Sequence, residues 1–267
     1  MILLSFDIEE FDMPMEYDRA IAFEEQIRIS VDGTRKILRM LADHHVKATF
    51  FCTAKFALSA PEIIYQIVDE GHELASHGYF HSRFSNDHLL SSKITLEKIS
   101  GQQIFGFRMP RMMAVNNDEL QKAGYEYNSS TNPTWLPGRY NNLGLKRTIH
   151  QTGKLFQLPA SVTPLFRIPL FWLSFHNFPL WLYKILCELT YFKDRYLNIY
   201  FHPWEFTDLN DKEKFGFPGY VSRNSGSGML ERMDNLITDF KSKGYEFGTI
   251  SEMLKIKEKV SEKIFAI

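Results

Sequence analysis

Two carboxylates close the first apolar run of the chain, where residues 5–9 read SFDIE. Side chains alternate along a strand, so Asp7 and Glu9 are expected to face the same side. Carboxylates this close require a cation or a shared proton. The alternative is an acidic exposed turn, because Glu10 and Asp12 follow directly.

Two histidines stand four residues apart in the segment GHELASHGYFH, after the short strand predicted over 73–76. If a turn of helix follows that strand, His77 and His81 lie on one face. This spacing suits a single divalent metal ion. A pair of surface histidines is the alternative interpretation.

Two further polar residues end apolar runs that are typical of strands. Arg108, in FRMP, could hold a carboxylate through a bidentate pair, or it could be a surface residue before a turn proline. His202 ends the run 197–202. A histidine at the mouth of a barrel can act as a general acid, whereas a core histidine bonded to a backbone carbonyl is the alternative.

The elements that position these residues alternate between strands and helices, which favours parallel pairing and an α/β fold. We expect a helix starting near Ser30 and a polar loop over 208–228 near the barrel rim. No domain boundary is evident, so residues 1–267 are predicted to form one domain. The predicted strands are 2–8, 46–52, 73–76, 104–108, 155–160, 197–202 and 246–250.

The composition excludes several classes of protein. With 31 Lys+Arg and 32 Asp+Glu, the net charge is −1, so no nucleic-acid partner is expected. Hydrophobic residues make up 44% of the chain, as in ordinary globular proteins. Aromatic residues make up 15%, which fits a large core or a cleft for sugar faces. The two cysteines, Cys52 and Cys187, are too few for a disulfide framework, and the sequence does not decide whether they form a single disulfide.

The N-terminal apolar run is short and lacks a basic region before it, so we expect a cytoplasmic protein. The most apolar region, 165–192, is interrupted by charged residues and by Pro169 and Pro179. We therefore expect two short elements and no transmembrane span. Its rings either fill the space between barrel helices or form a peripheral membrane contact at the barrel rim. Burial of Trp172, Phe175, Phe178 and Trp181 separates these two interpretations.

Taken together, the motifs resemble the polysaccharide deacetylase family, of the NodB-homology or carbohydrate esterase family 4 type. The resemblance extends over about residues 2–254, and is closest to the branch whose first motif is Asp-x-Glu. It implies a distorted (β/α) barrel with about seven parallel strands. The motifs that carry it are SFDIEEFD, ATFF, GHELASHGYFH, FRMP, GYEYNSS and YFHPWEF.

The resemblance also implies roles for six residues. They are Asp7 as catalytic base, Glu9, His77 and His81 as metal ligands, Arg108 as the group that orients the base, and His202 as general acid. Two imidazoles and a carboxylate fit Zn²⁺ best, with Co²⁺, Ni²⁺ or Mn²⁺ as alternatives.

The implied activity is metal-dependent removal of N-acetyl groups from an N-acetylated amino sugar or polysaccharide precursor. The alternatives are a hydrolase of a cyclic amide and a catalytically weak carbohydrate-binding barrel. One departure supports the last alternative: Asn128 stands where relatives commonly have Asp. An amide cannot stabilise an imidazolium by charge, so Asn128 could weaken activity. The oligomeric state and the carrier of the sugar stay open.

Overall fold

A curled parallel sheet forms the centre of the computed structural model, which describes residues 1–255. The strand order is β10-β1-β2-β3-β4-β5-β9-β8. The seven strands from β10 to β9 are parallel, and β8 runs antiparallel to β9. The predicted distorted barrel with about seven parallel strands is therefore confirmed.

The strands are short, and the central ones are buried on both faces, which explains their continuous apolar sequences. All residues of β1, β2 and β10 are buried. The strands of this sheet are β1 (Ile2–Ile8), β2 (Thr49–Cys52), β3 (Glu73–Ser76), β4 (Gly106–Phe107), β5 (Tyr127–Asn128), β8 (His150–Thr152), β9 (Leu155–Gln157) and β10 (Leu197–Phe201).

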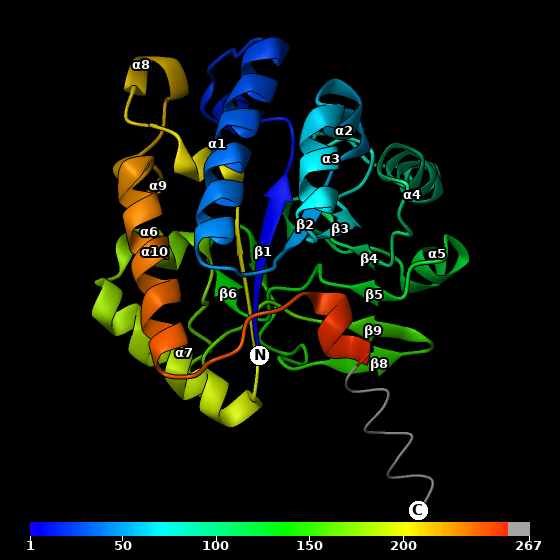
Figure 1. The fold of residues 1–267 in the computed structure, drawn as a ribbon. Coiled ribbons are helices and arrows are strands. Elements are labelled where there is room, and N and C mark those ends of the chain that lie inside the picture. The colour runs from blue at the N-terminus through cyan, green and yellow to red at the C-terminus, as the bar shows by residue number, and fades with distance from the viewer. Residues whose placement is uncertain (256–267) are drawn as a thin grey trace, which may run out of the picture.

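Helices cover the outside of the sheet. Figure 1 shows β1 at the centre, with α1 and α10 on one side of it and α3 on the other. The longer helices are α1 (Phe23–Asp43), α3 (Pro61–Asp69), α4 (Asp87–Ser100), α7 (Leu180–Asp194) and α10 (Ser227–Ser242). The shorter ones are η1 (Met13–Tyr17), α2 (Ala54–Ser59), η2 (Pro110–Met112), α5 (Asn117–Lys122), α6 (Trp172–Asn177), η3 (Pro203–Phe206), α8 (Lys212–Phe215) and α9 (Gly219–Ser222).

Side-chain and loop contacts, rather than a strand ladder, join the two ends of the parallel sheet. The Ser161 N–H donates to the Asn198 carbonyl at 2.8 Å, and the Asn198 N–H donates to Ser161 Oγ at 2.8 Å. The Asn198 amide also donates to the carbonyl of Pro159 at 3.1 Å. The barrel is distorted at this point because β10 meets irregular chain that follows β9.

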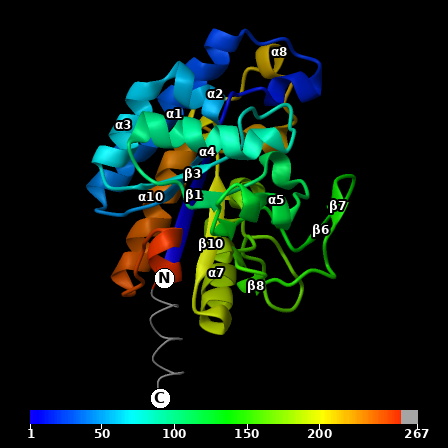
Figure 2. The ribbon, with the colours of Figure 1, turned by 90° about the vertical axis from the view of Figure 1, so that its right-hand side faces the viewer.

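Several predicted boundaries were wrong. The helix expected from Ser30 starts earlier, at Phe23. The strand expected over 246–250 reduces to one bridge between Phe247 and Ile2, and a helical segment follows it. The polar region 208–228 contains α8 and α9. Strands β6 (Trp135–Leu136) and β7 (Tyr140–Asn141) form an unpredicted hairpin that extends away from the barrel (Figure 2).

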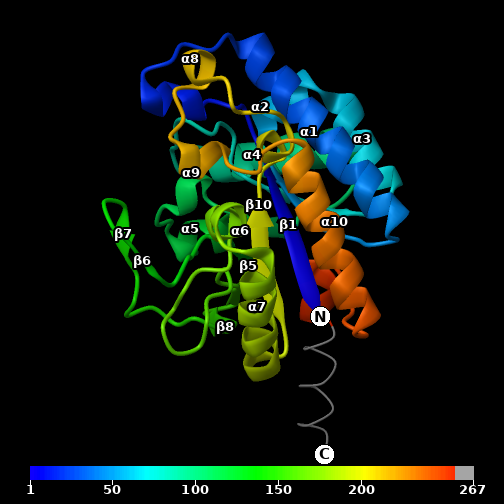
Figure 3. The same cartoon turned by 90° about the vertical axis from the view of Figure 1, so that its left-hand side faces the viewer.

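The apolar region 165–192 forms two helices, α6 and α7, separated at Phe178 and Pro179, as predicted. Within residues 1–255, no helix is long and apolar enough to cross a membrane. Figure 3 shows α7 along the outside of β10. Burial in this region is mixed: Phe175 is buried, Trp172 and Phe178 are half-buried, and Trp181 is 65% exposed. Neither interpretation of the region is therefore met in full.

Candidate active site

The six residues selected from the sequence meet at the carboxyl ends of the parallel strands, where (β/α) barrels hold their active sites. Asp7 is the penultimate residue of β1, and Glu9 follows that strand. His77, Arg108 and His202 each come directly after the last residue of β3, β4 and β10. Asp7, Glu9, His81 and His202 line a cavity of about 280 Å³.

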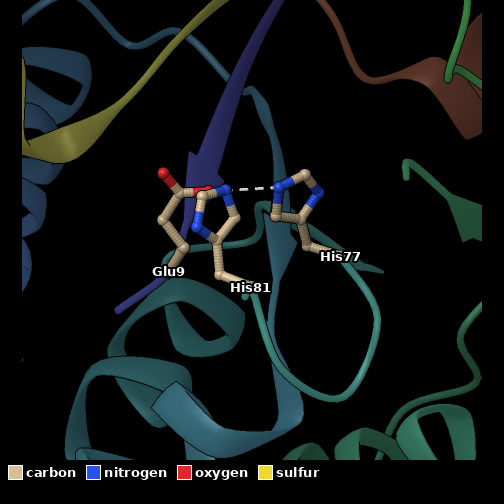
Figure 4. A group of neighbouring side chains, drawn as sticks. All are labelled: Glu9, His77 and His81. Atoms are coloured by element: carbon tan, nitrogen blue, oxygen red, sulfur yellow. Dashed lines mark hydrogen bonds and ion pairs between the residues drawn. The ribbon is translucent and has the colours of Figure 1, made fainter. Parts of the chain in front are cut away.

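Glu9, His77 and His81 form a buried cluster whose ligand atoms all lie within 4.8 Å of one another. Glu9 Oε2 is 3.1 Å from His77 Nε2 and 3.0 Å from His81 Nε2. Figure 4 shows both imidazoles directed toward the carboxylate. The expected turn of helix between the histidines was wrong: residues 77–81 are irregular, and Gly78 takes a φ of +80°, which favours glycine.

Each imidazole is oriented by an acceptor at its other nitrogen. His77 Nδ1 donates to the Arg108 carbonyl at 2.9 Å, and His81 Nδ1 lies 2.7 Å from Asp12 Oδ1. A carbonyl and a carboxylate only accept, so Nδ1 carries hydrogen in both rings and Nε2 is the atom directed at Glu9. Such outer partners are typical of metal-binding histidines. The donor set therefore fits a divalent metal ion.

Charge accumulates in this cluster. Burial alone would raise the pKa of Glu9, but the charge of His81 and the hydrogen bond with His77 lower it to about 2. Burial alone would lower the pKa of His81, but Glu9 and Asp12 raise it to about 9. A cation that binds His81 Nε2 at neutral pH therefore displaces a proton.

Asp7 and Arg108 form the predicted ion pair, with Arg108 Nη1 2.6 Å from Asp7 Oδ1. Both residues are buried. The expected bidentate geometry was wrong, because Arg108 donates through Nη2 to Ser129 Oγ at 2.9 Å and through Nε to the Ser129 carbonyl at 3.2 Å. The guanidinium also lies 4.0 Å from the centre of the Phe51 ring. These contacts hold Arg108 rigidly beneath the carboxylate.

His202 faces the cavity from the other side. Its Nδ1 lies 2.9 Å from Glu205 Oε1, and the same oxygen accepts the His202 backbone N–H at 2.6 Å. Burial alone would lower the pKa of His202, but the hydrogen bond with Glu205 and the charges of Glu9, Glu205 and Asp7 raise it. The ring stacks on Trp204, with centroids 4.7 Å apart. Glu205 therefore favours a protonated His202.

Sequence reasoning missed three residues of the site. Asp12 was interpreted only as part of an acidic turn, although it orients His81. Glu205 stands three residues after His202, and that spacing was the available signal. His176 contacts Glu205 Oε2 through Nε2 at 2.8 Å, yet it comes from α6. A lone histidine in an apolar helix gave no signal of this contact.

Asn128 lies away from His202, which corrects the suspicion that it replaces a carboxylate supporting that histidine. Its Oδ1 accepts from the Ser130 backbone N–H at 3.1 Å, and its Nδ2 donates to Gln157 Oε1 at 3.1 Å. The charge beside His202 comes instead from Glu205. Asn128 is therefore not in the place of a carboxylate that supports His202, and its effect on the charge of the site stays a prediction.

The walls of the cavity are aromatic, and a second cavity of about 660 Å³ adjoins it. Glu16, Arg111 and Arg139 line both cavities. The guanidinium groups of Arg111 and Arg139 contact the Glu16 carboxylate at 3.0 and 3.1 Å. The second cavity is rich in amides and hydroxyls. These belong to Asn117, Asn128, Ser130, Thr131, Asn142 and Gln157.

Comparison with known proteins agrees with this site. Residues 15–128 match the model of the family described as polysaccharide deacetylase, which confirms the resemblance found in the sequence. A peptidoglycan deacetylase of Helicobacter pylori is 28% identical over 107 residues. That match covers 37% of this chain and 36% of the relative, so the chain matches about a third of that protein's length.

Solved structures extend the likeness in fold to nearly the whole chain. A candidate polysaccharide deacetylase from Mycobacterium smegmatis has a TM-score of 0.64 at 20% identity, covering 98% of this chain and 90% of the other. An allantoinase has a TM-score of 0.62 at 15% identity, covering 95% of this chain and 88% of the other. At these identities the likeness concerns the fold alone.

Proposed function

We propose that this protein is a metal-dependent hydrolase that removes the N-acetyl group from an N-acetylated amino sugar within an oligosaccharide or polysaccharide. One observation carries the proposal. Glu9 and His81 of the buried cluster line the same cavity as a carboxylate held by an arginine, Asp7, and a histidine held by a carboxylate, His202. This arrangement provides a base and an acid on the two sides of a metal site.

Zn²⁺ is the metal that we propose, since two imidazoles and one carboxylate are a ligand set typical of catalytic zinc. Glu9, His77 and His81 would hold it. When bound, the metal polarises an amide carbonyl and lowers the pKa of water toward about 7. Trp204 Nε1 donates to Glu9 Oε1 at 3.3 Å, which leaves Oε2 directed at the two imidazoles.

Asp7 is the proposed general base, which takes a proton from the attacking water. Its carboxylate lines the cavity, and the pair with Arg108 fixes its orientation. His202 is the proposed general acid. Because Nδ1 contacts Glu205, Nε2 is the atom that donates a proton to the leaving nitrogen as the C–N bond breaks. The products are acetate and a free amine.

The cavities suggest an extended substrate. The rings of Tyr140, Trp172 and Tyr200 line the first cavity and suit the apolar faces of a sugar. The neutral amides of the second cavity suit the hydroxyl groups of a neighbouring sugar unit. We therefore expect an oligosaccharide to be hydrolysed faster than its monosaccharide.

The test is acetate release from N-acetylglucosamine and its oligomers, after chelator treatment and after Zn²⁺ is added back. Release that requires Zn²⁺ and rises with chain length supports the proposal. His202→Gln should lower release roughly 10²-fold or more. His88→Gln is the matched control, because His88 lies outside the site and packs against Phe80 with ring centroids 5.4 Å apart. No release from any sugar overturns the proposal.

A second candidate is hydrolysis of a cyclic amide, because the fold is one that an allantoinase shares, with a TM-score of 0.62. Adding a cyclic ureide to the panel separates the two activities, since ring opening releases no acetate. Binding of sugars without any turnover would favour the alternative of a weak carbohydrate-binding barrel.

Membrane contact stays a prediction, as does the cytoplasmic location. The outer face of α7 exposes Trp181, Ile185, Leu189 and Phe192 to 65, 46, 59 and 73%. Co-sedimentation with anionic and neutral liposomes tests the contact. Equal sedimentation of the wild-type protein and a Trp181→Ser/Phe192→Ser variant would reject it.

A further inference from the structure

Glu205 lies between two imidazoles. Its Oε1 contacts His202 Nδ1 at 2.9 Å, and its Oε2 contacts His176 Nε2 at 2.8 Å. Glu205 and His176 are both 0% exposed. The second nitrogen of His176, Nδ1, contacts the carbonyl of Arg223. A buried chain of polar contacts therefore runs from the cavity through η3 and α6 to the turn before α10.

The acceptors in this chain determine where hydrogen must lie. A backbone carbonyl only accepts, so His176 Nδ1 carries hydrogen. A carboxylate oxygen facing an unprotonated Nε2 would place two lone pairs together, so a proton also lies between His176 Nε2 and Glu205 Oε2. His176 and Glu205 thus share one proton, and the pair is neutral as a whole whichever atom holds it.

Neutrality matters because water does not reach the pair. A buried carboxylate that lacks a partner at one oxygen loses stabilisation, and it recovers by rotating toward another donor. Rotation of the Glu205 carboxylate would break its contact with His202. The contact with His176 opposes this rotation, because it provides a hydrogen-bond donor to the oxygen that His202 does not use.

One further contact is made to His176 itself, and two more attach residues 220–226 to α6 and to η3. The Asn224 amide donates to the His176 carbonyl at 2.7 Å, and the Asn177 amide donates to the Tyr220 carbonyl at 2.7 Å. The Gly226 N–H donates to the Glu205 carbonyl at 2.9 Å. Residues 220–226 are therefore attached both to α6 and to η3. Through these contacts, residues 220–226 fix α6, which carries the His176 imidazole, relative to η3, which carries Glu205.

We propose that His176 is a positioning residue that acts through Glu205 to hold His202 in the orientation for proton donation. The part of the proposal that concerns turnover rests on the proposed function. The part that concerns the contact between Glu205 and His202 does not.

The experiment compares His176→Phe with His176→Gln. Gln can donate one hydrogen to Glu205 from about the place of Nε2, whereas Phe cannot donate any. We expect His176→Phe to lower kcat roughly 10- to 100-fold, the usual effect of an outer partner, with little change in KM. His176→Gln should recover a large part of that loss. His72→Gln is the matched control, since His72 is buried and outside the site, and it should leave kcat unchanged.

Nuclear magnetic resonance of ¹⁵N-labelled histidine provides a readout without turnover. The Nδ1–H signal of His202 should persist in the wild-type protein and in His176→Gln, and should disappear or shift in His176→Phe.

If His176→Phe retains both the wild-type kcat and this signal, the proposal is overturned. If the wild-type protein hydrolyses no substrate, the proposed function fails, and the His202 signal alone decides the role of His176. If His176→Phe does not fold, His176→Met replaces it, because a thioether also donates no hydrogen to Glu205. A lost or shifted His202 signal in that variant supports the proposal, and an unchanged signal overturns it.

Discussion

The two sides of the site are built differently. On the metal side, Glu9 and the two histidines follow β1 and β3, the strands on either side of β2, either directly or a few residues further on. On the acid side, His202 depends on Glu205 and His176, which come from η3 and α6. The family model covers residues 15–128, which include both histidines of the metal side and no residue of the acid side.

This difference shows how the two sides achieve rigidity. The metal side relies on strand ends, whose geometry the sheet sets by itself. The acid side relies on a buried polar network between segments that are distant in sequence. One residue contacts both sides, because Trp204 donates to Glu9 Oε1 at 3.3 Å and stacks on His202. The following predictions test how far the two sides can be altered separately, from the largest effect to the smallest.

Replacing Glu9, His77 and His81 together by Ala should abolish stoichiometric metal and reduce turnover to background, because all ligand atoms of the cluster are removed. Elemental analysis measures the metal. Glu10→Gln is the matched control, since Glu10 is buried nearby but its Oε2 accepts from Thr53 Oγ1 at 2.6 Å. Full metal retention in the triple variant would show that the cluster is not the site.

Asp7→Asn should retain the metal and lower turnover roughly 10²- to 10⁴-fold, the usual contribution of a general base. Asn can still accept from Arg108, so the fold should be unaffected. Kinetics and metal content are measured on the same sample. Unchanged turnover would remove Asp7 from its role as base.

Asp12→Asn should weaken metal affinity roughly 10- to 100-fold, as loss of an outer partner usually does, because an amide orients His81 without its charge. Competition with a chromophoric chelator measures the affinity. Glu16→Gln serves as control, since Glu16 contacts Arg111 rather than His81. Equal affinities for the three proteins would contradict the role of Asp12.

Gly33→Ala should act mainly on the acid side. A Cβ at Gly33 of α1 would lie 1.9 Å from the Pro203 carbonyl oxygen, so η3 must shift and move His202. We expect a loss of about 1–3 kcal/mol in the free energy of unfolding and a lower kcat, with metal affinity intact. The control is Gly228→Ala in α10, where the nearest atom is 3.6 Å away. Weakened metal binding in Gly33→Ala would show that the two sides are coupled.

The last prediction concerns His72, a buried residue of the N-terminal half that lies outside the candidate active site. It accepts the Ala48 N–H through Nδ1, and burial together with the charge of Lys47 lowers its pKa to about 4. Above its usual pKa of about 6.5 the residue is neutral in both folded and unfolded chains. As the pH falls from about 6.5 to 4, the unfolded chain binds the proton more readily, so stability decreases.

The measurement is urea unfolding of the metal-free protein at pH 7.5 and pH 4.5. His72→Gln should lose less stability between these pH values than the wild-type protein, by about 1–3 kcal/mol. An equal loss in both proteins would place the acid sensitivity elsewhere.

Much of the fold and of the metal side could be predicted from the sequence. The apolar runs that end at Asp7, His77, Arg108 and His202 mark strands, and parallel strands bring their ends to one edge. The hairpin β6–β7 could not be predicted, because its strands are too short for a periodic signal. The predicted start of the first helix at Ser30 was wrong, because α1 begins at Phe23, where no side-chain cap marks the start in the sequence.

The sequence by itself determined the parallel barrel and the carboxylate, imidazole and arginine residues at its mouth. These depend on local spacing and on the shared direction of strands. Only the tertiary structure decided that Glu205 faces both His202 and His176, and that Asn128 does not contact His202. The physical reason is that hydrogen bonds between buried groups depend on the packing of α6, η3 and the turn at Arg223, which are separated along the chain and are placed by the core rather than by their own sequence patterns.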